Sequence, residues 1–302
     1  MKALIAGAEG QLGRELRGTA PAGVSVVACA RRELDIANAE MTHRVVADVK
    51  PDVVINAAAY TAVDRAEKER EAAFAVNAAG AGNLARAANA QGAWLLHVST
   101  DFVFDGMASR AYAPDSRPGP LGVYGQTKLQ GEERVRAAAA DSALIVRTSW
   151  VYSAHGANFV KTMLRLMNER DSLGVVADQI GAPTWAHRLA EVIWRAAAAR
   201  TIGVQHWSDA GVASWYDFAV AIQEEALSLG LVARKAAVRP IATSEYPTPA
   251  RRPQFSVLDS SALRSTLGIE PIHWRVNLRA MLRELKVQAA CDDSLLPAAP
   301  AL

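Results

Sequence analysis

Seven residues near the amino terminus restrict the fold more than any other part of this chain. The apolar run Lys2-Ala-Leu-Ile-Ala6 has the pattern of a buried parallel strand. It leads directly into Gly7-Ala-Glu-Gly-Gln-Leu-Gly13, and the helix-prone residues 14–17 follow. Glycine is needed where the backbone turns tightly, where it approaches a pyrophosphate and where a helix packs on a strand. A Gly-x-x-Gly-x-x-Gly turn between a strand and a helix therefore predicts a dinucleotide-binding fold.

The same turn predicts how the dinucleotide is held. A helix amino terminus offers free N–H groups and the positive end of its dipole to phosphate oxygens. The residues expected at the pyrophosphate are Gly7, Gly10, Gln11, Leu12 and Gly13.

The residues after the second strand predict the coenzyme. Residues 24–28 form this apolar strand, and Arg31 and Arg32 follow it closely. An acidic residue at this strand end would bond the ribose 2′-hydroxyl of NAD, whereas guanidinium groups suit a 2′-phosphate. We therefore predict NADPH, with NADH left open, and expect Asp35 and Ile36 near the adenine edge. A solvated loop is the alternative role for the two arginines.

Composition limits the classes of partner. The 302 residues carry a net charge of only +2, so the chain lacks the excess positive charge typical of proteins that bind nucleic acid or an anionic membrane surface. Cys29 and Cys291 are too few for a disulfide framework or a thiolate metal site. No apolar run reaches transmembrane length, and no leader segment precedes the first strand. We therefore expect a cytoplasmic protein with no nucleic-acid or membrane partner.

Strand and helix patterns alternate through the first half of the chain. Apolar runs at 53–56, 94–99 and 143–147 are separated by helix-prone segments, which predicts an α/β, Rossmann-like, doubly wound parallel sheet. We predict an NAD(P)-binding domain at 1–150 and a smaller C-terminal substrate-binding lobe at 151–287, interleaved with the first. Residues 288–302 are expected to form a disordered tail.

Small and polar residues follow two of the inner strands. Ala57, Ala58 and Ala59 come directly after the strand at 53–56, where small side chains would let the backbone approach a cofactor. Thr100 follows the strand at 94–99. Ligands bind at the carboxyl edge of such sheets, so Thr100 is a candidate site residue.

Tyr124 and Lys128 are four residues apart in a segment with helical character. Both side chains would therefore project from one helix face. A neighbouring ammonium favours the phenolate, so such a tyrosine could exchange a proton with a substrate oxygen near neutral pH. A solvated surface pair is the alternative role.

Taken together, these motifs resemble the extended short-chain dehydrogenase/reductase superfamily. The motifs are Gly7-x-x-Gly10-x-x-Gly13, Asn56-Ala-Ala-Ala59, Ser99-Thr100 and Tyr124-x-x-x-Lys128. The resemblance implies that Tyr124 is the acid/base and that Lys128 binds the nicotinamide ribose and lowers the pKa of the tyrosine. It also implies that Thr100 orients the reacting oxygen.

A finer resemblance is to the dTDP-4-dehydrorhamnose reductase family. It rests on the segments 10–13, 56–64, 99–106, 123–132, 147–152, 178–184 and 251–259. The resemblance implies NADPH-dependent reduction of the C4 keto group of dTDP-4-dehydro-L-rhamnose to dTDP-L-rhamnose, a step toward cell-surface polysaccharide.

The family resemblance also implies a set of substrate contacts. Trp150 could offer an apolar face to the 6-deoxy methyl or lie in the core, and Arg252 suits phosphate oxygens or the open surface. The full set of expected contacts is Thr61, Val63, Thr100, Trp150, Asn158 and Arg252. Some members bind Mg²⁺ between subunits, and Glu15 is the matching position here. A homodimer is a further implication.

Two competing functions remain open at this point. Another nucleotide-sugar reductase, an epimerase or a dehydratase could share the scaffold. Such dehydratases carry Asp-Glu after the threonine, and here Phe102 follows Asp101. A non-catalytic NADP-binding subunit, similar to the β subunit that regulates methionine adenosyltransferase, is the other alternative. The intact Thr100, Tyr124 and Lys128 argue against it.

Overall fold

The computed structural model of this protein describes residues 1–291. The tail expected from residue 288 lies outside the described residues from residue 292 onward, and up to Cys291 the chain is helical. Among the described residues, no helix is both long and apolar enough to cross a membrane.

A six-stranded parallel sheet forms the centre of the larger lobe, in the order β10-β5-β4-β3-β1-β2. All five pairings in it are parallel. The strands are β1 (Lys2–Ala6), β2 (Ser25–Cys29), β3 (Val53–Asn56), β4 (Trp94–Thr100), β5 (Ala143–Thr148) and β10 (Gly203–His206). The inner strands are almost wholly buried because helices cover both faces, and this explains their continuous apolar runs. The predicted α/β, Rossmann-like class is confirmed.

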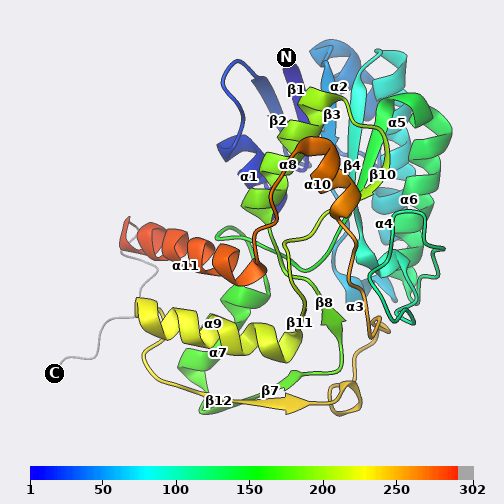
Figure 1. The fold of residues 1–302 in the computed structure, drawn as a ribbon. Helices are drawn as coiled ribbons and strands as arrows, with labels where there is room; N and C mark the ends of the chain where they lie inside the picture. The colour runs from blue at the N-terminus through cyan, green and yellow to red at the C-terminus, as the bar shows by residue number, and fades with distance from the viewer. Residues whose placement is uncertain (292–302) are drawn as a thin grey trace.

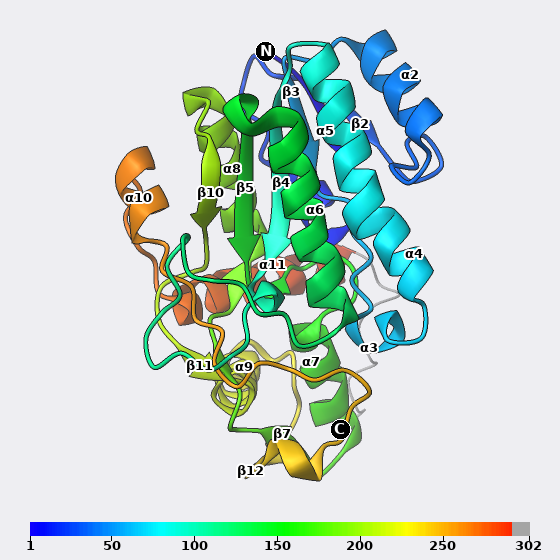
Figure 2. The same ribbon diagram turned by 90° about the vertical axis from the view of Figure 1, so that its right-hand side faces the viewer.

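Two groups of helices cover the two faces of the sheet (Figures 1 and 2). Side chains of alternating strand residues pack against α1 (Gln11–Gly18), α8 (Ala186–Ala199) and α10 (Ser261–Leu267) on one face. The opposite face packs against α2 (Ala39–Val49), α5 (Ala81–Ala90) and α6 (Val123–Ala139). The short helices α3 (Val63–Ala66) and α4 (Arg70–Phe74) precede α5. A π-helical turn, Ala75–Gly80, connects α4 to α5.

A second lobe lies beyond the carboxyl ends of the strands (Figure 2). Its helices are α7 (Phe159–Glu169), α9 (Trp215–Leu229) and α11 (Trp274–Cys291). They share a separate apolar core with the parallel pair β7 (Ser172–Val176) and β12 (Ala237–Ile241). Two further short pairs are β6 (Val151–Tyr152) with β9 (Thr184–Trp185) and β8 (Ile180–Gly181) with β11 (Ala213–Ser214).

The chain passes between the two lobes more than once. After α7 and β7 it returns to the central sheet through α8 and β10, and after β12 it returns again at α10. The carboxyl ends of β1, β3, β4 and β5 therefore face a second lobe. This lobe consists of chain segments that are separated in the sequence by elements of the first lobe.

Candidate active site

The glycine turn lies tightly between β1, β3 and the start of α1. Gly7 has a φ of +85°, and the N–H groups of Gly7 and Ala8 both donate to the carbonyl oxygen of Cys29 at the end of β2. A Cβ atom at Gly7 would lie 2.7 Å from the Ala58 nitrogen, and one at Gly13 would lie 2.1 Å from the Gly7 oxygen. Neither position has room for a side chain, so the turn keeps its backbone open at the amino end of α1.

The predicted alanine segment meets this turn. Ala57, Ala58 and Ala59 are half-buried at the end of β3, and the N–H of Ala58 donates to Asn56 Oδ1 at 3.1 Å. The turn and the alanines together form the wall of small residues and backbone expected for a close cofactor approach.

The residues after β2 differ in their exposure. The side chains of Arg31 and Arg32 are 80% and 74% exposed, and they pair with Asp35 at 3.5 Å and Glu9 at 3.1 Å. Ile36 is buried, with its side chain packed against Gly80 of the π-helical turn. The two guanidinium groups are thus accessible beside the glycine turn, whereas Ile36 belongs to the protein core.

Thr100, Tyr124 and Lys128 lie together at the carboxyl end of β4. The Thr100 hydroxyl donates to Asp101 Oδ1 at 3.0 Å and accepts from the Phe102 N–H at 3.2 Å. Lys128 is 2% exposed; its Nζ donates to the Val98 carbonyl oxygen at 2.6 Å and lies 3.4 Å from His97 Nε2.

Burial dominates the electrostatics of this group. Burial raises the pKa of Tyr124 to about 12; the Asp101 charge adds to the rise, and the neighbouring Thr100 hydroxyl opposes it. Burial also lowers the pKa of Lys128 to about 8, against the opposing charge of Glu132. Lys128 is not among the causes of the shift at Tyr124, so burial sets its direction here, and the lowering by the lysine that the resemblance implies stays a prediction.

Phe102 occupies the position at which a dehydratase would carry its glutamate. Its ring packs edge-on against Tyr124, with ring centroids 5.6 Å apart and an interplanar angle of 75°. The site therefore has an apolar wall beside the tyrosine and no carboxylate at residue 102.

The residues expected to bind substrate are spread over several places. Thr61 is exposed, Val63 begins α3, and the next residue, Asp64, pairs with Arg252 at 2.8 Å. Asn158 caps α7 and donates to Gln11 Oε1 at 3.0 Å, so it reaches the glycine turn.

Trp150 lies at the junction of the lobes. It has a φ of +47° and stacks on Trp215, with ring centroids 3.5 Å apart. Trp215 in turn lines a cavity of about 410 Å³ in the second lobe, together with Phe159, Gln179, Tyr246, Thr248 and Arg252. Arg252 also lines a neighbouring cavity of about 600 Å³. Arg252 therefore lines both cavities, whereas Trp150 lines neither and reaches the first only through its stack on Trp215.

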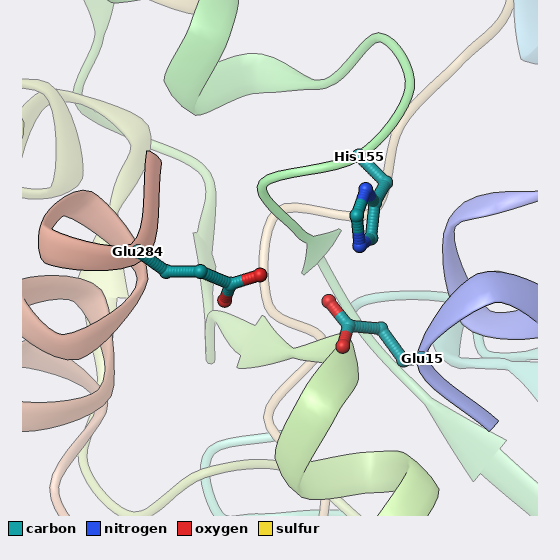
Figure 3. A group of neighbouring side chains, drawn as sticks. All are labelled: Glu15, His155 and Glu284. Atoms are coloured by element: carbon teal, nitrogen blue, oxygen red, sulfur yellow. The ribbon is translucent and has the colours of Figure 1, made fainter. Parts of the chain in front are cut away.

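Glu15 lies away from this surface, in a cluster with His155 and Glu284. Figure 3 shows the three side chains pointing toward one another from α1, the loop after β6 and α11, and one ligand atom of each lies within 4.8 Å of the others. Both carboxylate oxygens of Glu15 already accept hydrogen bonds, from Ser153 at 2.6 Å and His187 at 3.1 Å.

This cluster gives no support to the magnesium ion that the family resemblance suggested. That ion was expected between subunits, whereas these three residues belong to one chain, and the imidazole among them is a donor better suited to other metals. We therefore assign no magnesium to Glu15.

Comparison with known proteins identifies the relatives of this chain. A family model described as the RmlD substrate binding domain matches residues 1–287. A Burkholderia thailandensis protein named dTDP-4-dehydrorhamnose reductase is 45% identical over 95% of this chain and 100% of its own length. The chain belongs to the dTDP-4-dehydrorhamnose reductase family. The resemblance predicted from the motifs is thereby confirmed.

Solved structures of the dTDP-4-dehydrorhamnose reductase family have the same fold. One from Clostridium acetobutylicum superimposes with a TM-score of 0.90 at 40% identity, covering 95% of this chain and 100% of the other. One from Bacillus anthracis, in complex with NADP, has a TM-score of 0.87 at 37% identity, covering 94% of this chain and 99% of the other. This agreement supports a nicotinamide cofactor for the present family member.

Sequence reasoning assigned no site role to three polar residues near this reductase site. Asn56 and His97 are buried beneath the cofactor wall and joined by a 2.9 Å contact, and Asp101 is buried beside Thr100. Asn56 ends β3 and Asp101 follows β4, so their places at the carboxyl edge of the sheet were a signal, whereas His97 lies in the middle of β4 and gave none. Their partners, however, come from other strands and helices.

Proposed function

We propose that this protein reduces the C4 keto group of dTDP-4-dehydro-L-rhamnose with NADPH and so forms dTDP-L-rhamnose. One observation carries the proposal: Thr100, Tyr124 and Lys128 lie together at the carboxyl end of β4, in a chain whose relatives are named dTDP-4-dehydrorhamnose reductase. Reduction needs a proton donor and no proton-abstracting carboxylate, and the site offers a tyrosine walled by Phe102.

The glycine turn and the alanine segment would hold the coenzyme. The open backbone at the start of α1 suits the pyrophosphate, and Arg31 and Arg32 suit a 2′-phosphate because both guanidinium groups are exposed. The bound nicotinamide supplies the hydride for C4.

The protein's own share is positioning and proton transfer. Tyr124 would donate its phenolic proton to the C4 oxygen as charge develops there, and Thr100 would hydrogen-bond the same oxygen. Lys128 would donate an N–H to the ribose and, when protonated, stabilise the phenolate left on Tyr124.

The second lobe would bind the remainder of the substrate. Arg252 would bind diphosphate oxygens, a role supported by its place in the lining of both cavities, and would exchange its pairing with Asp64 for them. Trp150 would offer an apolar face to the 6-deoxy methyl. Thr61 and Val63 would lie near the sugar. Asn158, which donates to Gln11, would act from the cofactor side.

A spectrophotometric assay tests the proposal. Purified protein with NADPH and dTDP-4-dehydro-L-rhamnose should lose the nicotinamide absorbance and produce dTDP-L-rhamnose. Turnover of a different 4-keto sugar nucleotide, with none on this substrate, would contradict the substrate assignment. Absence of turnover on all such sugars, with NADPH bound, would support a non-catalytic role.

A further inference from the structure

The Thr100 hydroxyl has one proton, and its acceptor within hydrogen-bond geometry is Asp101, with the Tyr124 oxygen as a second neighbour. Thr100 Oγ1 donates to Asp101 Oδ1 at 3.0 Å, and the Phe102 N–H donates to Oγ1 at 3.2 Å. A threonine that stabilises negative charge on a substrate oxygen must donate a hydrogen bond to it. With Asp101 ionised, Thr100 cannot donate to the substrate without leaving the carboxylate.

The surroundings of Asp101 disfavour the ionised form. The residue is 2% exposed, and its Oδ2 atom has no hydrogen-bond partner among the described residues. The groups that face it are the Thr100 and Ser256 hydroxyls, the Phe102 backbone and Tyr124 of α6. None of the ion pairs within residues 1–291 includes Asp101, so no cation offsets its burial.

The titration of Asp101 agrees with this geometry. Burial raises its pKa to about 6, against the opposing effect of the nearby Ser256 and Thr100 hydroxyls. The charge of Asp101 is also one cause of the raised pKa of Tyr124. An ionised Asp101 therefore hinders both proton-donating groups of the site.

We propose that Asp101 is a positioning residue that works as a neutral carboxylic acid and donates its proton to Thr100 Oγ1. The reversed hydrogen bond frees the Thr100 hydroxyl to donate to the C4 oxygen. The neutral carboxyl also removes the negative charge beside Tyr124 and makes the phenol a stronger acid. The Asp101 proton stays in place through the reaction, so proton balance is unchanged. This inference rests on the proposed function.

The pH profile of two variants tests the proposal. Wild-type kcat should fall about tenfold for each pH unit above the Asp101 pKa, because only the neutral carboxyl supports turnover. Asp101→Asn keeps an N–H donor for Thr100 at every pH, so it should retain kcat within a few-fold of the wild-type maximum and lose this fall. Asp101→Ala, with no donor, should stay slow throughout.

Asp209→Asn is the matched control. Asp209 is a second buried carboxyl group, and burial raises its pKa to about 7. It accepts a hydrogen bond from the Trp185 N–H and does not contact Thr100. This variant should keep the wild-type pH profile. An Asp101→Asn protein that is folded but inactive, or one with an unchanged profile, would overturn the proposal.

An infrared measurement separates this inference from the proposed function, since it needs no substrate. Below about pH 6, the wild type should show the C=O absorption band of protonated carboxyl groups. The part of this absorption that comes from Asp101 should be missing from the spectrum of Asp101→Asn. If the wild type shows this titration but turns over no sugar, the proposed function fails. If the two proteins have the same band at pH 5, the inference about Asp101 fails whatever the activity.

Discussion

His97 Nε2 lies 3.4 Å from Lys128 Nζ, and the neighbours of His97 determine which ring nitrogen carries the proton. The Ala58 N–H donates to Asn56 Oδ1 at 3.1 Å, which turns the Asn56 amide nitrogen toward His97 Nδ1 at 2.9 Å. Nδ1 therefore accepts, and a neutral ring must carry its proton on Nε2. Lys128 Nζ then faces the Nε2–H group of His97. This arrangement favours the neutral amine of Lys128, which can accept a hydrogen bond, over the ammonium, which can only donate.

This arrangement predicts a fixed tautomer for His97. Burial, with the Lys128 charge, holds the pKa of His97 well below its usual value, so the ring should be neutral at pH 6.5, where a free imidazole is half protonated. Long-range ¹H–¹⁵N NMR of histidine-labelled protein should show the Nε2–H form, with the signal assigned by its loss in His97→Gln. An Nδ1–H signal, or a ring that titrates near pH 6.5, would contradict the prediction.

Tyr124→Phe should reduce kcat by roughly 10²- to 10⁴-fold, the usual contribution of a positioned acid. The variant removes only the phenolic oxygen and keeps the edge-on contact with Phe102. NADPH affinity, measured by fluorescence titration, should therefore stay close to the wild-type value. Unchanged kcat would remove Tyr124 from the proposed role.

Gly13→Ala should abolish NADPH binding, because the new Cβ would lie 2.1 Å from the Gly7 oxygen and force the turn apart. We expect a loss of stability of about 1–3 kcal/mol, typical of overpacking. Gly18→Ala is the control, since a Cβ at that end of α1 meets nothing within 4 Å. Calorimetry and NADPH titration of both variants check the prediction. Equal behaviour would show that the turn tolerates expansion.

The double variant Arg31→Ala, Arg32→Ala should weaken NADPH binding at least tenfold and leave NADH binding nearly unchanged. Hydrogen bonds to a charged group contribute about 1.5–3 kcal/mol each, and only NADPH offers the 2′-phosphate. Both side chains are largely exposed, so their removal should not disturb the fold. Equal losses of affinity for the two coenzymes would refute the 2′-phosphate argument.

Arg279→Ala should reduce the acid sensitivity of the fold. Hydrogen bonds from Arg279, and then Arg275, lower the pKa of Glu225 to about 2 from 4.5. A lowered carboxyl pKa contributes stability that is present above about pH 4.5 and is lost as the pH falls through about 2.

Urea unfolding at pH 7 and pH 3 measures this effect. The variant should lose more stability at pH 7 than at pH 3, because Glu225 is increasingly protonated in the unfolded chain at the lower pH. Arg165→Ala breaks an exposed helical pair with Glu169 and should change stability by less than about 0.5 kcal/mol at either pH. An equal loss for Arg279→Ala at both pH values would contradict the assignment.

Much of the fold could be predicted because it depends on local pattern. The buried strands β1, β3, β4 and β5 are continuous apolar runs, and their burial on both faces of the sheet requires this composition. The glycine turn could be recognised because two positions in it have no room for a Cβ atom. The four-residue spacing of Tyr124 and Lys128 places them on one side of α6 wherever that helix lies.

The sequence by itself thus determined the fold class, the cofactor turn and the residues at the carboxyl edge of the sheet. Only the tertiary structure decided their protonation. The raised pKa of Tyr124, the tautomer of His97 and the burial of Asp101 depend on loss of water and on partners from β3, β4, α6 and the segment near Ser256. The grouping of Glu15, His155 and Glu284 likewise needs three distant segments to meet. Desolvation and through-space charge have no local sequence pattern, because both arise only when the chain has folded.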